Sequence, residues 1–452
     1  MVDLIIAMMA LAVILVIGYL LAAFILPNGI SGPAELLAVS FGMGTGLIYT
    51  QMFIVSWLGY ALSFSGLLII LSADVVLLLV FGLKKAKLIA AKLRATEYPR
   101  LNLTETILLT VILANLLLIF IDALSLPMNS WDAIAIWSFK AKILYREPIR
   151  YSAYFSDPTK SYSHPDYPLL VPFIQSYIYR FLGSVDDRLA RIIFPCFFLF
   201  LLLSVYSAVT NSASRKYGLF FTALLATAPC VVSDSSSGYV DVALAFYYFS
   251  MAAYLYLWMK KGSTEYIVLS ALFSALAVCT KNEGMGLFLV GSAVIVLFNI
   301  VNLKKDNLKQ LACYLATALA VMSPWLIFRR QITVIQEDYF SRLSLPIILH
   351  NAERIRVILT SFIREFINVN TWNVLWLIAA LVILLSFRHV FRAPVVYLLL
   401  LLVMHLGMYI LIYVITPWNI EVLIPSTLTR LLIHVAPVAM LLSSELVIPV
   451  YK

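Results

Sequence analysis

Residues 103–124 read LTETILLTVILANLLLIFIDAL, and this stretch decides the class of fold. Between Glu105 and Asp122 it holds no charged residue, and its apolar residues run without the polar–apolar alternation of a membrane β-strand. About 20 such residues, coiled as a helix, cross the roughly 30 Å hydrocarbon core of a bilayer. The stretch therefore predicts a transmembrane helix.

The rest of the chain repeats this pattern. Of its 452 residues 63% are hydrophobic and 12% are charged, about half the charged share of a soluble domain. The mean hydropathy is +0.97. Apolar blocks follow one another so closely that we expect one all-α polytopic membrane bundle instead of the two or three soluble domains that the length would suggest. About 13 transmembrane helices are predicted, in a range of about 11 to 14, over residues 3–26, 34–57, 60–83, 103–124, 190–210, 218–233, 240–259, 266–280, 284–301, 311–328, 373–387, 394–415 and 431–449.

Basic residues occupy alternate short loops. The formal net charge is +9, but Lys and Arg of membrane proteins concentrate in cytoplasmic loops, so this charge gives no support for nucleic-acid binding. The N-terminus carries Asp3 and no basic side chain. If it lies outside, the following residues all lie inside: Lys84, Lys85, Lys87, Lys92, Arg94, Arg100, Arg215, Lys216, Lys260, Lys261, Lys304, Lys305, Lys309, Arg388 and Arg392. We expect a multi-pass protein of the plasma (inner) membrane with its N-terminus outside.

The four cysteines, Cys196, Cys230, Cys279 and Cys313, lie in or beside apolar blocks without paired spacing. Free cysteine behaves as a small apolar residue. We therefore interpret them as core residues and not as metal ligands or disulfide partners.

Three segments fall on the outer face, at about 125–187, 329–372 and 416–430, and the first two are too long to be mere connectors. Amphipathic stretches at 132–144 and 351–367 predict helices that lie flat at the membrane interface. Function is therefore expected on the outer face. We divide the chain into N-terminal helices with a basic cytoplasmic loop, residues 1–100, and a second transmembrane module that carries these outer-face segments, residues 101–452.

Asp132 stands where a membrane helix gives way to the first interfacial helix. Its carboxylate is placed either to cap that helix or to act as a general base at the membrane surface. Further along, His164 and Asp166 either form a capped turn or share a proton or a metal ion.

Other charged residues lie at the outer ends of later spans. Arg191 is an interfacial anchor or a phosphate ligand, and Asp241 either caps the apolar run after it or serves a site. Lys281 and Glu283 sit between two apolar blocks, where ionisable groups are costly and are candidates for function. Arg430 and His434, four residues apart, project from one face of the last helix.

Taken together, these residues resemble the GT-C superfamily of membrane glycosyltransferases, most closely its protein O-mannosyltransferase and lipid A aminoarabinose transferase branch. That branch opens an interfacial helix with an acidic residue, the place of Asp132 in WDAIAIWSFKAKILYREPIRY (131–151). Its later His-Pro-Pro-Leu-like, Ala-Arg-like, Asp, Thr-Lys-Gly-like and late Arg elements are similar to His164–Leu170, Ala190–Arg191, Asp241, Thr280–Gly284 and Arg430, the last followed by Pro437. The chain departs from the branch in having Ala133 where Glu is usual, Asp166 and Tyr167 in place of the second Pro-Leu, and three additional spans before residue 84.

The resemblance implies a hexosyl- or pentosyltransferase that acts at the outer membrane face. Its donor would be a polyprenyl-phosphate sugar embedded in the lipid bilayer, its acceptor a glycan, lipid or protein, and the transfer would invert the anomeric centre. The roles implied are general base for Asp132, phosphate binding for Lys281, Arg430 and Arg191, and substrate orientation or metal binding for His164, Asp166, Asp241 and Glu283. Whether a divalent metal ion takes part stays open.

A second class of function is a transporter, flippase or polymerase for a lipid-linked saccharide. Such a protein also needs cations within a large apolar bundle. Transporters often show internal repeats and polar sites near the bilayer midplane. The chain shows no convincing repeat, and its ionisable residues cluster at one surface, which favours surface chemistry.

Overall fold

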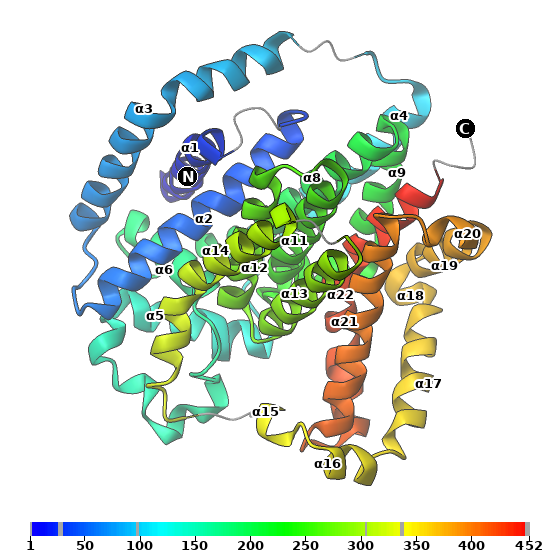
Figure 1. Cartoon of the computed structure of the whole chain (residues 1–452). Coiled ribbons are helices and arrows are strands. Elements are labelled where there is room, and N and C mark those ends of the chain that lie inside the picture. The colour runs from blue at the N-terminus through cyan, green and yellow to red at the C-terminus, as the bar shows by residue number, and fades with distance from the viewer. Residues whose placement is uncertain (1, 26–29, 96–98, 303–304, 335–338, 448–452) are drawn as a thin grey trace.

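The computed structural model describes residues 2–25, 30–95, 99–302, 305–334 and 339–447. Helices make up the secondary structure of these described ranges, with no β-strand among them, which confirms the all-α prediction. Figure 1 shows the helices gathered into one bundle, with α3 (Phe64–Ala95) standing at its outer edge.

Within the described ranges, ten helices are long and apolar enough to cross a membrane, or up to 11 if one bent pair counts as a span. The chain is therefore a multi-pass integral membrane protein. Besides α3, these helices are α1 (Val2–Ile25), α2 (Pro33–Trp57), α4 (Leu103–Ser125), α7 with α8 (Asp187–Ala190 and Ile193–Ser212), α11 (Asp241–Lys261), α13 (Glu283–Val301), α14 (Lys305–Arg329), α21 (Val395–Ile415) and α22 (Ile420–Val447).

This number is smaller than the predicted 13, for two physical reasons. Helices α12 (Thr264–Thr280) and α19 (Leu375–Leu385) have 17 and 11 residues, so each is short for a crossing. The span predicted at 218–233 is split into α9 (Arg215–Ala226) and α10 (Pro229–Ser237), which meet at 68°. Pro229 lacks the N–H group that would continue the hydrogen-bond ladder of α9.

A capping box starts α4. The Asn102 side chain accepts a hydrogen bond from the Glu105 backbone N–H at 2.9 Å, and the Glu105 carboxylate accepts one from the Asn102 backbone N–H at 3.0 Å. Such boxes satisfy N–H groups that a helix start leaves unpaired. Arg215, the first residue of α9, donates to the same carboxylate at 2.9 and 2.6 Å, so the starts of α4 and α9 are joined.

The segment after α4 is more structured than an outer loop. The predicted amphipathic stretch at 132–144 is helical, but it begins as a π-helix, η1 (Ala133–Ser138), which continues into α5 (Phe139–Arg146). The run LLVPFIQSYIY (169–179) forms most of α6 (Leu170–Leu182) and is buried. Helix α6 packs against α1, α2 and α5, because its apolar side chains need partners on several sides.

The three N-terminal spans extend the same bundle. Tyr177 of α6 donates a hydrogen bond to the Ala10 carbonyl of α1 at 2.9 Å, and the hydroxyls of Thr45 in α2 and Tyr247 in α11 lie 2.7 Å apart. All four cysteines are free; Cys196 and Cys279 are buried, as predicted for core residues, whereas Cys230 and Cys313 are only partly buried.

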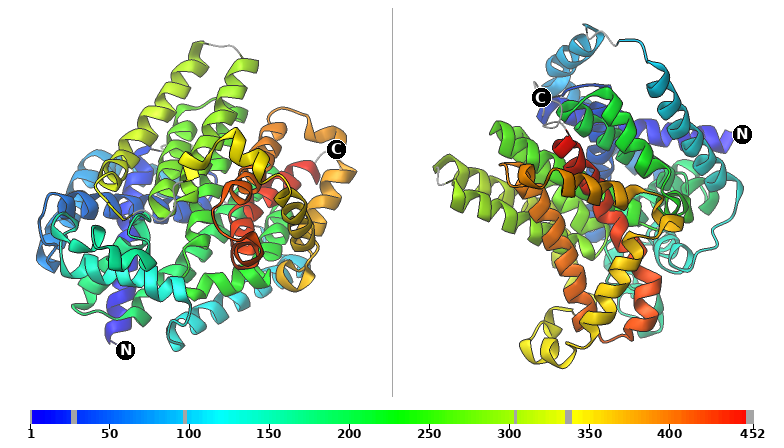
Figure 2. Two further views of the ribbon diagram at one scale, coloured as in Figure 1. Left: turned by 90° about the horizontal axis from the view of Figure 1, so that it is seen from below. Right: turned by 90° about the vertical axis from the view of Figure 1, so that its right-hand side faces the viewer.

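The two views of Figure 2 show residues 339–390 gathered with α21 and α22 at one side of the molecule. The predicted amphipathic stretch at 351–367 forms α17 (Arg354–Phe366). Its buried residues Ile358 and Phe362 belong to the face that packs on α21 and α22. In Figure 1 α17 runs alongside α21.

Candidate active site

Asp241, the first residue of α11, is the centre of a buried ionic network. Its side chain is 0% exposed. Oδ1 accepts hydrogen bonds from Lys281 Nζ at 2.7 Å and His434 Nε2 at 3.0 Å. Oδ2 accepts two from Arg430, from Nε at 2.9 Å and from Nη2 at 2.8 Å. A carboxylate that accepts four hydrogen bonds is fixed in position and stays ionised.

The start of α11, the connection between α12 and α13, and the interior of α22 bring these groups together. Asp241 opens α11, Lys281 lies between α12 and α13, and Arg430 with His434 lies on α22, which packs against α11. The spacing of four residues places Arg430 and His434 on one face of α22, as the sequence predicted, and the structure shows that both contact Asp241. Lys281 also pairs with Glu283, the first residue of α13, at 2.8 Å.

Asp241 does not cap α11. The carboxylate that does so is that of Asp234, from the preceding helix α10, whose Oδ2 accepts from the Val242 backbone N–H at 3.3 Å. Asp241 is thereby left for the cations of the network.

Asp132 joins the network from the side of η1. Arg430 Nη1 donates to Asp132 Oδ2 at 2.8 Å, and the two side chains are 19% and 26% exposed. Within the described part of the chain Asp132 makes no capping bond to η1, so the capping interpretation is wrong. Asp132 is instead the carboxylate of the network most open to solvent or lipid.

Two tyrosines support the network, and the sequence did not reveal either of them. The Tyr409 hydroxyl lies 2.7 Å from His434 Nδ1. If His434 Nε2–H donates to Asp241, then Nδ1 accepts from Tyr409, which fixes a neutral tautomer. The Arg430 guanidinium lies 4.0 Å from the centre of the Tyr239 ring. This cation–π contact restricts the orientation of the guanidinium group.

Arg430 and Lys281 each have N–H groups without a hydrogen-bond partner among the described residues. Bonds to described residues take three of the five N–H groups of Arg430 and two of the three of Lys281. Preorganised donors of this kind can bind an oxyanion and stabilise charge that develops on it.

Arg191 lies outside this network. Its guanidinium donates to the carbonyls of Ser236, Leu126 and Pro127 and to Asp122 Oδ2, the last at 3.3 Å. All three of its nitrogens are thus engaged by the protein. This arrangement fastens the chain that leads to Asp132 onto α8 and α10.

A second cluster contains His164, Asp166 and Lys140, and the sequence had not revealed Lys140. Lys140 on α5 and Asp166 are 1% and 0% exposed. The Lys140 ammonium lies 5.3 Å from the ring centres of both Trp137 and Tyr167 and donates to the Tyr167 carbonyl at 3.4 Å. The only hint in the sequence was a lysine within the amphipathic run WSFKAKIL (137–144).

The polar groups of this cluster are short of partners. Among the described residues, neither oxygen of Asp166 has a hydrogen-bond partner, nor has Nδ1 of His164. His164 adopts a left-handed backbone conformation, φ 48°, which is rare for any residue but glycine and is common at functional sites.

Burial perturbs the pKa of each group in this second cluster. Burial lowers the pKa of Lys140 to about 7 and raises that of Asp166. The pKa of His164 falls to about 4, because of burial first and the neighbouring Lys140 second. The fields of Lys140 and Asp132 both act on His164, so the cluster lies near the ionic network.

A metal site is not evident. Across the described ranges, no three His, Cys, Asp or Glu side chains converge as metal ligands. Both oxygens of Asp241 are taken by nitrogen donors, and His164 with Asp166 supplies two candidate ligands.

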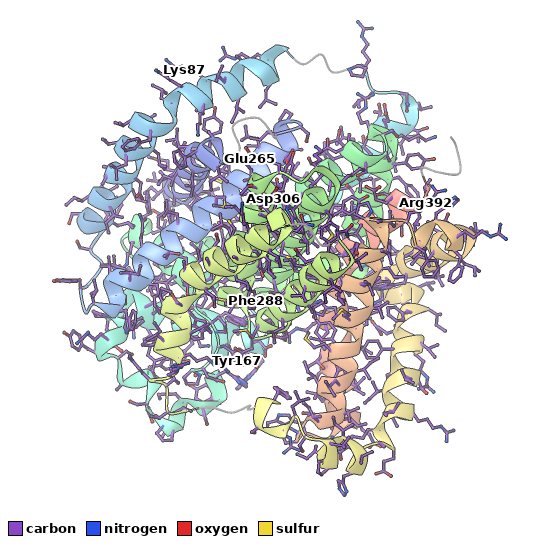
Figure 3. All side chains as sticks on the ribbon, viewed as in Figure 1. Lys87, Tyr167, Glu265, Phe288, Asp306 and Arg392 are labelled. Atoms are coloured by element: carbon purple, nitrogen blue, oxygen red, sulfur yellow. The ribbon has the colours of Figure 1, made fainter. Side chains whose placement is uncertain are left out.

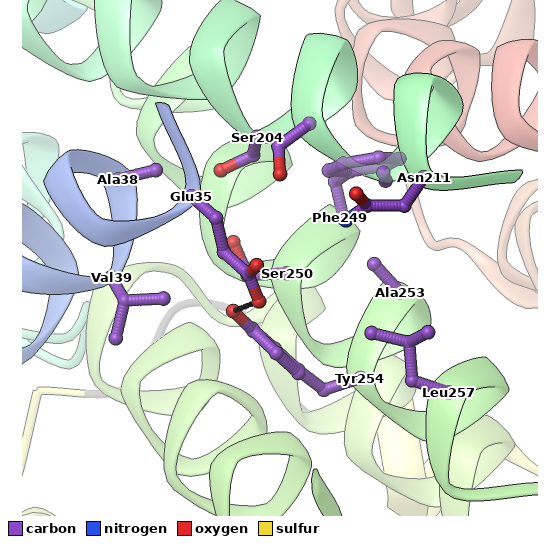
Figure 4. Close-up of a pocket in the computed structure, with 12 residues that line it drawn as sticks. Glu35, Ala38, Val39, Ser204, Asn211, Phe249, Ser250, Ala253, Tyr254 and Leu257 are labelled. Atoms are coloured by element: carbon purple, nitrogen blue, oxygen red, sulfur yellow. Dashed lines mark hydrogen bonds between the residues drawn. The ribbon is translucent and has the colours of Figure 1, made fainter. Parts of the chain in front are cut away.

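A small pocket lies at the other end of α11, between α2, α8 and α11 (Figure 4). It encloses about 30 Å³, space for about one water molecule. Its buried carboxylate, Glu35, accepts from the Tyr254 hydroxyl at 2.9 Å and from the Ser31 backbone N–H at 2.8 Å. Tyr254 lies 13 residues beyond Asp241, about 20 Å along a helix, so this pocket is separate from the ionic network.

Comparison with known proteins places these observations in context. Residues 164–328 match the family described as "Dolichyl-phosphate-mannose-protein mannosyltransferase". Asp241 and Lys281 lie inside the matched range, whereas Asp132 and Arg430 lie outside it. No curated protein matches the sequence.

Two solved structures of ArnT share the fold of this chain. ArnT from Cupriavidus metallidurans bound to undecaprenyl phosphate is 13% identical over 75% of this chain, with a TM-score of 0.51. Its apo state is 14% identical over the same share, with a TM-score of 0.50. The chain spans 59% of the length of those ArnT chains. The oligosaccharyltransferase from Archaeoglobus fulgidus is 15% identical over 75% of this chain and 49% of its own, with a TM-score of 0.45. The family match and the ArnT-like fold confirm the predicted resemblance to GT-C glycosyltransferases.

Proposed function

We propose, from the match of residues 164–328 to the dolichyl-phosphate-mannose-protein mannosyltransferase family, that this chain transfers a sugar from a polyprenyl-phosphate donor. The acceptor would be a hydroxyl or amine of a glycan, lipid or protein. One observation carries the proposal: the network of Asp132, Arg430, Asp241, Lys281 and Glu283, with unused cationic donors beside a partly exposed carboxylate.

In the proposed reaction Lys281 and Arg430 hold the phosphate that links the sugar to the lipid. The acceptor oxygen or nitrogen forms a bond to the anomeric carbon, from the face opposite the phosphate. The bond from that carbon to the phosphate oxygen breaks, and its electron pair leaves with the polyprenyl phosphate. Asp132 accepts the proton of the acceptor as general base, while Lys281 and Arg430 stabilise the charge that develops on the leaving phosphate.

Asp241 serves in this scheme as a positioning residue. It is fully buried and bonded to both cations, so it aims Lys281 and Arg430 and does not itself touch substrate. His434 is hydrogen-bonded to Asp241 and is itself held by the Tyr409 hydroxyl. The Glu283 carboxylate forms a second ion pair with Lys281.

We assign orientation of the sugar or acceptor to His164, Asp166 and Lys140. Their unsatisfied groups, beside the aromatic faces of Trp137 and Tyr167, suit a ligand rich in hydroxyls. Arg191 supports the site indirectly, by fastening the segment that leads to Asp132. A role for a divalent metal ion stays open.

The proposed orientation puts the N-terminus and the active site outside the plasma membrane. In Figure 3 Lys87, Glu265, Asp306 and Arg392 lie toward the upper side of the view and Tyr167 toward the lower side. In this view the labelled basic residues Lys87 and Arg392 lie on the other side from Tyr167 of the second cluster, which supports an outward-facing site, because Lys and Arg concentrate in cytoplasmic loops. Residues 1–100 are proposed as an addition to the catalytic module of residues 101–452.

The test uses purified protein in nanodiscs with a panel of radiolabelled polyprenyl-phosphate sugars and with membrane lipids and glycans as acceptors. The expected result is acceptor-dependent release of free polyprenyl phosphate from one donor, lost in Asp132→Asn. If no donor is consumed but labelled lipid moves between the leaflets of proteoliposomes, the chain is a transporter for a lipid-linked saccharide and the proposal is wrong.

A further inference from the structure

The contact between Asp132 and Arg430 joins the two ionic-network residues that reach furthest out of the protein. Their side chains are 26% and 19% exposed, whereas those of Asp241 and Lys281 are 0% and 8% exposed. A phosphate that enters the site therefore meets Arg430 first on the side of Nη1, where Asp132 is bound.

Asp132 and the donor phosphate compete for the same group. A guanidinium N–H binds carboxylate and phosphate oxygens in the same geometry. In the observed state Asp132 therefore occupies a position that a phosphate oxygen can take, and its Oδ2 is engaged by Arg430 instead of by an acceptor.

The local backbone allows Asp132 to leave. It directly precedes the six-residue π-helix η1, a rare geometry that is frequent at functional sites. Its neighbour Trp131 is 67% exposed, whereas Ala133 on the other side is buried, so the Asp132 side chain can move with the residue before it while η1 stays packed. Upstream, Arg191 holds the carbonyls of Leu126 and Pro127, which leaves a short segment between a fixed anchor and η1.

We propose that the Asp132–Arg430 ion pair is a latch that the phosphate of the donor opens. The inference rests on the proposed function. An oxygen of the phosphate replaces Asp132 on Arg430 Nη1, and Asp132, relieved of the cation, becomes the base for the acceptor. The site then binds donor first, and the acceptor is activated only when a donor is present.

Equilibrium binding of undecaprenyl phosphate to the purified full chain in nanodiscs tests the latch. Because Asp132 competes with the phosphate, Asp132→Asn and Asp132→Ala should bind this lipid about five- to tenfold more tightly than wild type, although both lose transfer. The matched control is Asp122→Asn, which removes a carboxylate paired with Arg191 and should leave the affinity unchanged.

Arg430→Gln separates the two proposals. If this variant binds undecaprenyl phosphate as well as wild type does, the phosphate assignment of the proposed function is wrong. If Arg430→Gln loses binding, and both Asp132 variants, folded as judged by thermal unfolding, bind with unchanged or weaker affinity, the latch alone is overturned.

Discussion

Two aspartates, Asp241 and Asp166, are both fully buried, yet the protein treats them in opposite ways. Asp241 accepts hydrogen bonds from Lys281, His434 and twice from Arg430. Asp166 receives none from the described residues, although the charge of Lys140 acts on it. Burying a carboxylate without partners is costly, so native proteins seldom do it without a reason.

The difference separates a preorganised part of the site from a part that awaits a ligand. A saturated network fixes its cations before substrate arrives, as electrostatic catalysis requires. An unsatisfied cluster gains its missing hydrogen bonds when a polar ligand enters. We therefore associate the network with the donor phosphate and the Lys140–His164–Asp166 cluster with the sugar or acceptor.

The largest effect is expected from Asp241→Asn. This change keeps the shape of the side chain but removes the charge that aligns both cations, and we expect transfer to fall about 10³-fold. The measurement is initial-rate release of polyprenyl phosphate. Asp74→Asn, which alters a carboxylate of α3 paired with Gln51, is the matched control and should stay within about twofold of wild type. A folded Asp241→Asn protein with nearly full activity would remove the distinction between the two regions.

Replacing a lysine in each region sharpens the comparison. Lys281→Met leaves the Glu283 carboxylate without its cation and removes one of the two cations bound to Asp241, and it should cost about 3–5 kcal/mol of stability. Lys140→Met removes a cation that makes no close ion pair with a described residue and one hydrogen bond, to the Tyr167 carbonyl, so it should cost only about 1 kcal/mol. It should nevertheless reduce transfer about tenfold, with unchanged binding of undecaprenyl phosphate, because a hydrogen bond to the sugar or acceptor is lost. Thermal unfolding and transfer assays measure both; equal destabilisation by the two changes would contradict this view.

A smaller effect is expected from Tyr409→Phe. The change removes the hydroxyl that fixes the tautomer of His434, and we expect kcat to fall about three- to tenfold without a change in lipid affinity. Tyr248→Phe is a suitable control, because the buried Tyr248 hydroxyl has no hydrogen-bond partner among the described residues. Similar losses of kcat in both variants would show that His434 is not held through Tyr409.

The smallest effect concerns stability against pH. Burial lowers the pKa of Lys140 from the ordinary 10.5 to about 7. Between these values the unfolded chain binds a proton that the folded chain does not, so stability rises with pH through this window. The thermal midpoint of wild type should therefore rise by a few degrees relative to that of Lys140→Met. Parallel pH profiles would show that Lys140 is not buried as described.

Much of the ionic network could be predicted from the sequence. Four charged residues stand at the ends of apolar blocks, where an ionisable group is costly and is a candidate for function. They are Asp132, Asp241, Lys281 and Arg430. Alternate loops placed them at the same end of the bundle, and the structure brings these four together with Glu283 and His434.

What the sequence did not reveal depends on packing and not on pattern. Lys140 reads as one polar position of an amphipathic helix, and only the fold buries it between Trp137 and Tyr167. The same holds for the number of spans, since the apolar block of α19 matches a membrane helix in composition but has only 11 helical residues. The second role of Asp132, as partner of Arg430, joins residues 298 positions apart, and no local signal reports it.

The most direct test of the account is an electron cryomicroscopy structure of the full chain in nanodiscs with a non-transferable polyprenyl-phosphate sugar. We predict that the phosphate lies within hydrogen-bond distance of Lys281 Nζ and Arg430, with the sugar toward His164 and Asp132 freed from Arg430. A phosphate bound elsewhere, with the hydrogen bonds of Asp241 and the Asp132–Arg430 ion pair unchanged, would contradict the central claim that this network is the donor site.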